Sequence, residues 1–208
     1  MPAPQPLPVP TPAPQAAQQA APHPGADPRS PAADHIMAVA LRLFAEHGVD
    51  GVSVRQIAQG AGQKNHNAVT YYFDSKESLV RAIIIDGARA IDERRNAWLD
   101  GAERDGQLGS VCAVVDGLIR TSLSPNPPPW GECYNRFVVG LQMSNRALFM
   151  DSVGGRWNGG YLRCQDHIRA LLPAIPAATL NQRLLFMGAA LGGILSARES
   201  ELANQSRP

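Results

Sequence analysis

Residues 53–79 read SVRQIAQGAGQKNHNAVTYYFDSKESL, and they carry the most informative pattern in the chain. Ser53, followed three residues later by Gln56, forms a capping-box pattern that predicts the start of a short helix. Small residues then lead into Gly62, where a tight turn is expected to end that helix. Val69 and Phe73 are four residues apart, so they give the next segment one buried helical stripe. The pattern predicts two short helices, the second over about residues 66–73, joined by a polar turn.

Helical patterns continue on both sides of this stretch. Ser30-Pro31 is a plausible helix start, and apolar residues recur from there at helical spacing until Gly48. Asp74 and Glu77 form a second capping-box pattern, which predicts a long helix over about residues 75–99. Glycines and prolines divide the remainder into further predicted helices at about residues 107–123, 130–144, 145–153, 156–172 and 178–201. No strand-like alternation of useful length occurs, so the predicted fold class is all-α.

The second of the two short helices carries polar groups on its outer face. His66, Asn67, Thr70 and Tyr71 can reach base edges or phosphates, while Ala58, Ala61 and Gly62 allow the two helices to cross closely. These features are typical of a helix-turn-helix that binds DNA. Residues 32–78 contain four basic and five acidic residues, so this region has no excess of positive charge. An alternative therefore stays open, in which these are two packed helices that do not bind DNA.

Over about residues 33–82 the sequence resembles the TetR regulators. The residues that carry the resemblance are Phe44, Gly48, Ser53-Val54-Arg55-Gln56-Ile57-Ala58, Ala61-Gly62, Val69, Tyr72-Phe73, Ser75-Lys76-Glu77 and Leu79. It implies an N-terminal three-helix DNA-binding domain at residues 31–78 and a C-terminal helical domain at residues 79–208 that binds an effector and dimerises. The chain is one residue longer than the commonest family spacing between Gly62 and Phe73, and Thr70 stands where many members have a tyrosine.

The resemblance also implies roles for individual residues. Ser53, Tyr72 and Lys76 match positions that bind backbone phosphates in the family. Phe73 and Leu79 match core positions. The remaining candidates for contact with DNA are Arg55, Lys64, Asn65, His66, Asn67, Thr70 and Tyr71.

The C-terminal half carries the candidates for effector binding and dimerisation. The apolar, aromatic or thiol side chains expected to line an effector pocket are Trp98, Trp130, Cys133, Phe137, Met143, Trp157 and Tyr161. The last helix is apolar almost all round and rich in glycine, which favours a closely packed homodimer interface. A dimer implies a palindromic operator in double-stranded DNA. The family mechanism implies a repressor that an unidentified small molecule releases.

Composition and motif content bear on where the chain resides and on whether it could be an enzyme or a metal-binding protein. The chain has 208 residues and a net charge of +1, and residues 1–30 form a Pro/Ala-rich tail expected to be disordered. The apolar runs are too short to span a bilayer and no secretory signal is evident, so cytoplasmic residence is expected. The three cysteines predict free thiols, and no spacing predicts a metal site, a cofactor or catalysis. The alternative is a helical small-molecule-binding protein or an enzyme that does not bind DNA.

Overall fold

The computed structural model describes residues 30–63, 65, 67–123 and 131–205. All regular secondary structure in these ranges is helical, which confirms the predicted fold class. The elements are α1 (Pro31–His47), α2 (Val54–Gly60), α3 (Ala68–Phe73), α4 (Lys76–Arg104), α5 (Val111–Ser122), the 3₁₀ helix η1 (Gly131–Cys133), α6 (Tyr134–Ser144), α7 (Arg146–Val153), α8 (Gly159–Leu171) and α9 (Ala177–Gln205). Among the described helices, none is both long and apolar enough to cross a bilayer. The expected tail lies, except for Ser30, outside the described residues.

Local capping explains where the first two helices begin. The Oγ of Ser30 accepts a hydrogen bond from the Ala33 N–H at the start of α1, and Pro31 follows as the first helical residue. In α2 the Gln56 N–H donates to the Ser53 Oγ, and the Ser53 N–H donates to the Gln56 Oε1 at 2.8 Å. This reciprocal pair is the predicted capping box, and it is confirmed.

The start of α4 differs from the prediction. Its N-cap is Ser75, whose Oγ accepts from the Ser78 N–H at 3.0 Å, and not Asp74. Asp74 instead ends α3: its N–H donates to the Thr70 carbonyl and its φ is 67°. An N-cap needs an extended backbone, so a residue already held in this left-handed conformation cannot serve as one.

Several further helix boundaries differ from the predicted ones, among them the start of α3 and the end of α4. Helix α3 begins at Ala68, about two residues later than predicted, because the side-chain Oδ1 of Asn65 accepts from the Asn67 N–H and holds those residues in a turn. Helix α4 continues to Arg104, five residues beyond the predicted end. Leu99 and Ala102 are buried there, so tertiary packing extends the helix to Arg104, and Gly106, whose φ is 66°, follows in the turn after it.

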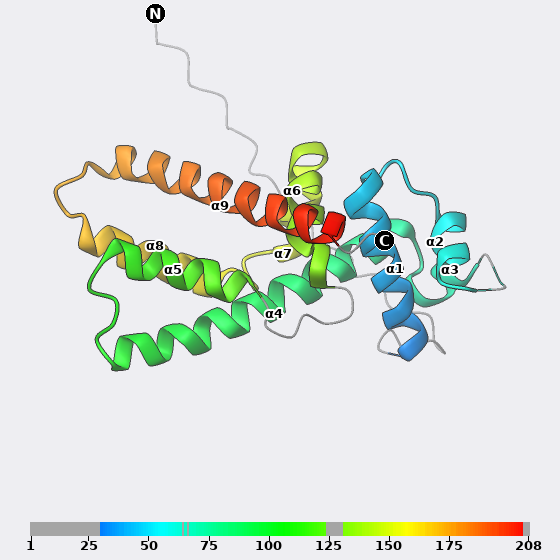
Figure 1. Ribbon diagram of the computed structural model, residues 1–208, viewed down its shortest axis with the longest axis horizontal. Helices are drawn as coiled ribbons and strands as arrows, with labels where there is room; N and C mark the ends of the chain where they lie inside the picture. Colours follow the sequence, from blue (N-terminus) through cyan, green and yellow to red (C-terminus); the bar gives the residue numbers. More distant parts are fainter. Residues whose placement is uncertain (1–29, 64, 66, 124–130, 206–208) are drawn as a thin grey trace, which may run out of the picture.

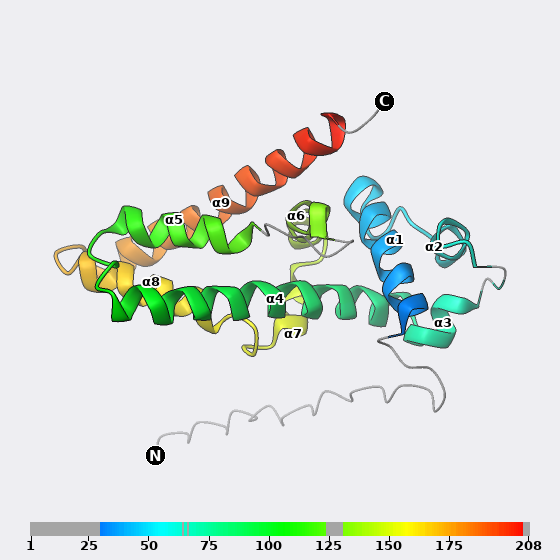
Figure 2. The ribbon, with the colours of Figure 1, turned by 60° about the horizontal axis from the view of Figure 1, so that its bottom comes forward.

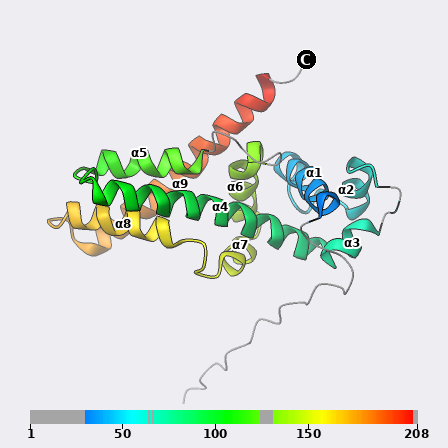
Figure 3. The ribbon, with the colours of Figure 1, turned by 90° about the horizontal axis from the view of Figure 1, so that it is seen from below.

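The helices form an elongated molecule (Figure 1). Helices α1 to α3 lie at one end, and α4 runs from them to the opposite end, where α5 and α8 pack along it (Figure 2). Helix α9 returns toward α1 and makes its most extensive contacts with α6. Seen from below, α6 and α7 lie between the two ends (Figure 3).

Two apolar clusters stabilise this arrangement. The first joins α1, α2 and α3 to the first half of α4 and to α6, and in it the rings of Phe44 and Phe137 stack with centroids 6.1 Å apart. The second joins the far half of α4 to α5, α8 and α9 around Leu99 and Cys164. The first cluster therefore ties the helix-turn-helix directly to α6 of the C-terminal half.

Candidate nucleic-acid interface and effector cavity

Helices α2 and α3 bury their apolar sides and expose their polar ones. Ile57 and Ala58 of α2 and Val69 and Phe73 of α3 enter the first apolar cluster or are buried beside it. The exposed side chains of the two helices and their turn include Arg55, Asn65, Asn67, Thr70 and Tyr71. Helices α2 and α3 lie at one end of the molecule, and α1 lies between them and the helices α6, α7 and α9 (Figure 1). A polar surface of two helices is thus presented away from the rest of the described chain.

The two adjacent tyrosines of α3 have different environments. Tyr71 is exposed, whereas Tyr72 is half-buried and packs against the first apolar cluster. Their rings meet edge to face, with centroids 5.0 Å apart. Tyr72 is therefore held by packing on both sides, so that its ring is fixed in orientation at the surface.

Lys76 brings the start of α4 to the start of α2. Its Nζ donates to the Val52 carbonyl at 2.7 Å, and Val52 directly precedes the N-cap Ser53. The ammonium group has three N–H donors, so this bond leaves two for another acceptor. Ser53 is exposed at the same corner. Sequence reasoning placed both residues on the DNA side but missed the bond that links them, because Lys76 and Val52 are 24 positions apart. Lys64 and His66 lie outside the described residues.

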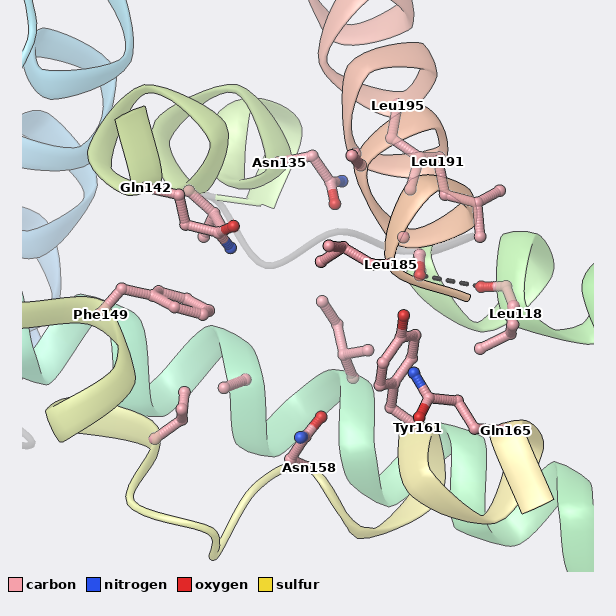
Figure 4. Close-up of a pocket in the computed structure, with 18 of the residues that line it drawn as sticks. Leu118, Asn135, Gln142, Phe149, Asn158, Tyr161, Gln165, Leu185, Leu191 and Leu195 are labelled. Carbon is pink, nitrogen blue, oxygen red and sulfur yellow. Dashed lines mark hydrogen bonds between the residues drawn. The ribbon is translucent and has the colours of Figure 1, made fainter. Parts of the chain in front are cut away.

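A cavity of about 600 Å³ lies in the C-terminal half, between α9 and the layer formed by α4 to α8 (Figure 4). Two of the predicted effector residues, Trp157 and Tyr161, line it. Tyr161 is directed from α8 toward α9, where the hydroxyl approaches Gly188 so closely that a Cβ there would lie 2.6 Å from it.

Four of the predicted effector residues do not line this cavity. Phe137 and Cys133 are buried in the first apolar cluster, where Phe137 faces Phe44 of α1. The indole of Trp98 packs over Gly117, whose missing side chain makes room for it. Met143 is 86% exposed on α6. Aromatic content alone did not distinguish a helix face turned toward another helix from one turned toward a cavity. The remaining candidate, Trp130, lies outside the described residues.

No disulfide joins the three cysteines, all of which lie in the described part of the chain. Cys133 and Cys164 are buried, and Cys112 is exposed. Burial raises the pKa of the Cys133 thiol to about 11, so this side chain stays protonated at neutral pH.

Arg95 is a cavity residue that sequence reasoning missed. It lies on α4 and is 8% exposed, in the same helical stripe as the buried Ala88, Asp92, Leu99 and Ala102. Two charges, Asp92 and Arg95, interrupt this apolar stripe, and they are the signal that could have identified Arg95, because such residues are seldom buried without a partner.

Glu199 of α9 connects the cavity helix to α6. Its carboxylate is buried and accepts from the backbone N–H groups of Asn135 and Arg136, at 3.1 and 2.7 Å, and from the Asn135 side chain. Burial raises the pKa of Glu199, although these hydrogen bonds act in the opposite direction. The carboxylate thus caps the first turn of α6 from another helix. Since α6 packs on α1, α9 is joined through α6 to the helix-turn-helix.

Large apolar side chains remain exposed on α9. They include Leu185, Phe186 and Ile194, the last two being 60% and 65% exposed. Leu162 of α8 and Leu202 near the end of α9 are exposed as well. Exposed apolar residues at this density often mark a surface that another protein covers.

Comparison with known proteins identifies the N-terminal part. Residues 36–83 match the family model described as bacterial regulatory proteins, tetR family, and this range contains α2, α3 and the start of α4. The chain has no sequence match among curated proteins. A solved structure, the TetR family transcriptional regulator PfmR from Thermus thermophilus, is 17% identical, covers 79% of this chain and 94% of its own, and has a TM-score of 0.46. Residues 36–83 therefore form a helix-turn-helix DNA-binding domain of the tetR family.

Proposed function

We propose that the chain is a TetR family repressor, which binds a palindromic operator as a homodimer and leaves it when a small molecule enters the cavity. Residues 31–78 form the DNA-binding domain in this proposal, and residues 79–208 form the effector-binding and dimerisation domain. The observation that carries it is the joint presence of a capped helix-turn-helix with a polar outer face and a lined cavity beside the same α4.

Three residues are proposed to hold the DNA backbone. Ser53 and Lys76 sit together where α2 and α4 begin, and the free donors of Lys76 suit a phosphate oxygen. Tyr72 is held against the core with its ring at the surface. Base and further backbone contacts are assigned to the exposed Arg55, Asn65, Asn67, Thr70 and Tyr71, and also to Lys64 and His66, which lie outside the described residues.

Coupling between cavity and operator is proposed to run through two helices. Helix α4 lines the cavity through Ile91 and Arg95 and carries Lys76 at its first turn. Helix α6 lines the cavity through Asn135 and packs on α1. An effector that prefers one arrangement of α4 and α6 therefore shifts the population of DNA-binding conformations.

Binding to DNA is tested with the purified full chain and a fragment from upstream of its own gene. Lys76→Ala is expected to weaken binding about tenfold or more, because one charge-assisted contact is worth about 1.5–3 kcal/mol. The loss should be similar on all sequences, and the slope of log affinity against log salt should fall by about one. Fluorescence anisotropy at several salt concentrations measures both quantities.

Arg120→Ala provides the matched control, because Arg120 is an exposed cation of α5. Its affinity and salt slope should equal those of the unmodified chain. If Lys76→Ala leaves the slope unchanged, Lys76 holds Val52 without touching a phosphate. No retardation of any genomic fragment by the unmodified chain would contradict the proposed function.

Dimerisation is tested by placing charge on α9. Phe186→Glu combined with Ile194→Glu is expected to convert a dimer into a monomer at micromolar concentration, because two exposed apolar side chains, eight residues apart on the helix, would become buried carboxylates in the interface. Sedimentation velocity measures the mass. Met143→Glu, an equally drastic change at an exposed residue of α6, should leave the dimer intact. A monomeric unmodified chain would rule out the α9 interface.

A further inference from the structure

Arg95 is a buried cation with neutral partners. Its Nε donates to the Thr121 Oγ1 at 3.0 Å and its Nη2 donates to the Ser122 Oγ at 2.8 Å. Both hydroxyls in turn donate to carbonyls of α5, those of Gly117 and Leu118, so they accept from Arg95 without carrying charge. Burial lowers the pKa of Arg95. Within the described ranges, Nη1 makes no hydrogen bond.

The acid nearest along α4 does not neutralise this arginine. The Oδ1 of Asp92 accepts from the Gly160 N–H at 2.8 Å, and its Oδ2 accepts from the Asn96 side chain at 3.2 Å. Asp92 exerts a favourable Coulomb effect on Arg95, but no carboxylate of the described chain forms an ion pair with the guanidinium. The Tyr161 ring adds a cation-π contact, with its centroid 5.9 Å from the Arg95 Cζ.

The cavity wall contains two other arginines, and neither resembles Arg95. Arg169 is paired with Asp166 at 2.8 Å, and its second amino group donates to Gln165 and Asn181. Arg146 is exposed at the start of α7. None of the described lining residues is acidic. Arg95 is therefore a buried cation of the wall that, within the described residues, forms no ion pair.

The rest of the wall combines apolar surface with uncharged polar groups. Ile91, Leu118, Val138, Phe149, Trp157 and Leu191 supply the apolar part. Amide side chains supply the uncharged polar part, among them Asn135, Gln142, Asn158 and Gln165 (Figure 4). The volume lies within the range of roughly 300–1,000 Å³ that is usual for small-molecule sites.

We propose that the cavity binds an amphipathic organic anion, with an apolar chain or ring system against the apolar wall and one carboxylate-type group paired with Arg95. A buried charge costs free energy unless it is paired, and a ligand anion would supply the ion pair that Arg95 lacks among the described residues. Arg95 offers Nη1, with Nε and Nη2 already held by α5, so the guanidinium is oriented before the ligand arrives. The inference rests on the proposed function only in taking this cavity as the effector site.

Calorimetry of the full chain without DNA tests the inference. The probes are octanoate, decanoate and 2-naphthoate, each compared with its primary amide and with the corresponding primary amine. At least one carboxylate is expected to bind about tenfold or more tightly than its amide, as a charge-assisted hydrogen bond implies, and the amines are expected to bind most weakly. If no carboxylate binds more tightly than its amide, the proposal is overturned, whatever any variant does.

Variants locate the charge. Arg95→Gln should bring the affinity for the carboxylate down to that for the amide, while the amide binds as before. Arg95→Lys should retain part of the preference. Arg120→Gln, at an exposed arginine of α5 that does not line the cavity, is the matched control and should leave the preference unchanged. A preference that survives in Arg95→Gln would assign the anion to another group. Because no DNA is present, failure to retard DNA would leave this result standing, and failure of the anion preference would leave operator binding intact.

Discussion

Phe137→Ala is expected to lower the free energy of unfolding by about 3–5 kcal/mol, because truncation of a buried phenylalanine removes its transfer free energy and leaves a cavity. Phe137 is 1% exposed and lies between the ring of Phe44 on α1 and that of Tyr134 at the start of α6. The two centroid distances are 6.1 and 6.3 Å. The truncation removes the packing contact between α6 and α1, which joins α6 to the helix-turn-helix. Urea unfolding followed by circular dichroism measures it.

Met143→Ala is the control for this truncation. Met143 lies on the same helix but is 86% exposed, so its loss should change the free energy of unfolding by about 0.5 kcal/mol or less. A Phe137 variant that unfolds at the same urea concentration as the Met143 variant would mean that α6 does not pack on α1 as described.

Gly87→Ala is expected to destabilise the protein by about 2–3 kcal/mol, the upper part of the usual range for overpacking. A Cβ at this position of α4 would overlap the ring of Tyr134. The ring cannot easily withdraw, because its hydroxyl donates to the Ile84 carbonyl at 2.9 Å and the side chain is buried. Burial also raises the pKa of Tyr134, so the phenol remains a neutral donor.

Gly101→Ala, in the same helix, should change the stability in the opposite direction. Apart from its chain neighbours and the backbone of its own helix, no described atom lies within 4 Å of a Cβ built there, so alanine should stabilise the helix by up to about 1 kcal/mol through its higher propensity. Differential scanning calorimetry of both variants compares the two effects directly. Equal and small shifts would show that α4 and Tyr134 are not in close contact.

Local chemistry explains which features the sequence predicted well. The Ser30 cap, the Ser53–Gln56 capping box and the glycine after α1 each depend on residues within a few positions, so their patterns are readable without knowledge of the fold. The second predicted capping box was wrong for the same kind of reason. Asp74 and Ser75 could each cap the N-terminus of α4. Because Asp74 is the C-cap of α3, Ser75 caps α4.

Tertiary structure decided what lines the cavity. Trp157 and Tyr161 line it, as predicted. Phe137 instead packs against Phe44, and Trp98 packs over Gly117. Both of these partners are distant in sequence. Arg95 was missed because an arginine within a helical pattern is usually a solvated one. Only the packing of α5 and α8 against α4 buries it beside Thr121 and Tyr161.

Caps, turns and apolar spacing act over a few residues, so the helices, the helix-turn-helix at residues 53–73 and its resemblance to the TetR family could be predicted before the packing was known. Which faces of those helices meet, and which leave a cavity between them, depends on how the whole chain packs. Burial and pairing of charges such as Lys76, Arg95 and Glu199 depend on neighbours that lie tens of residues away in the chain.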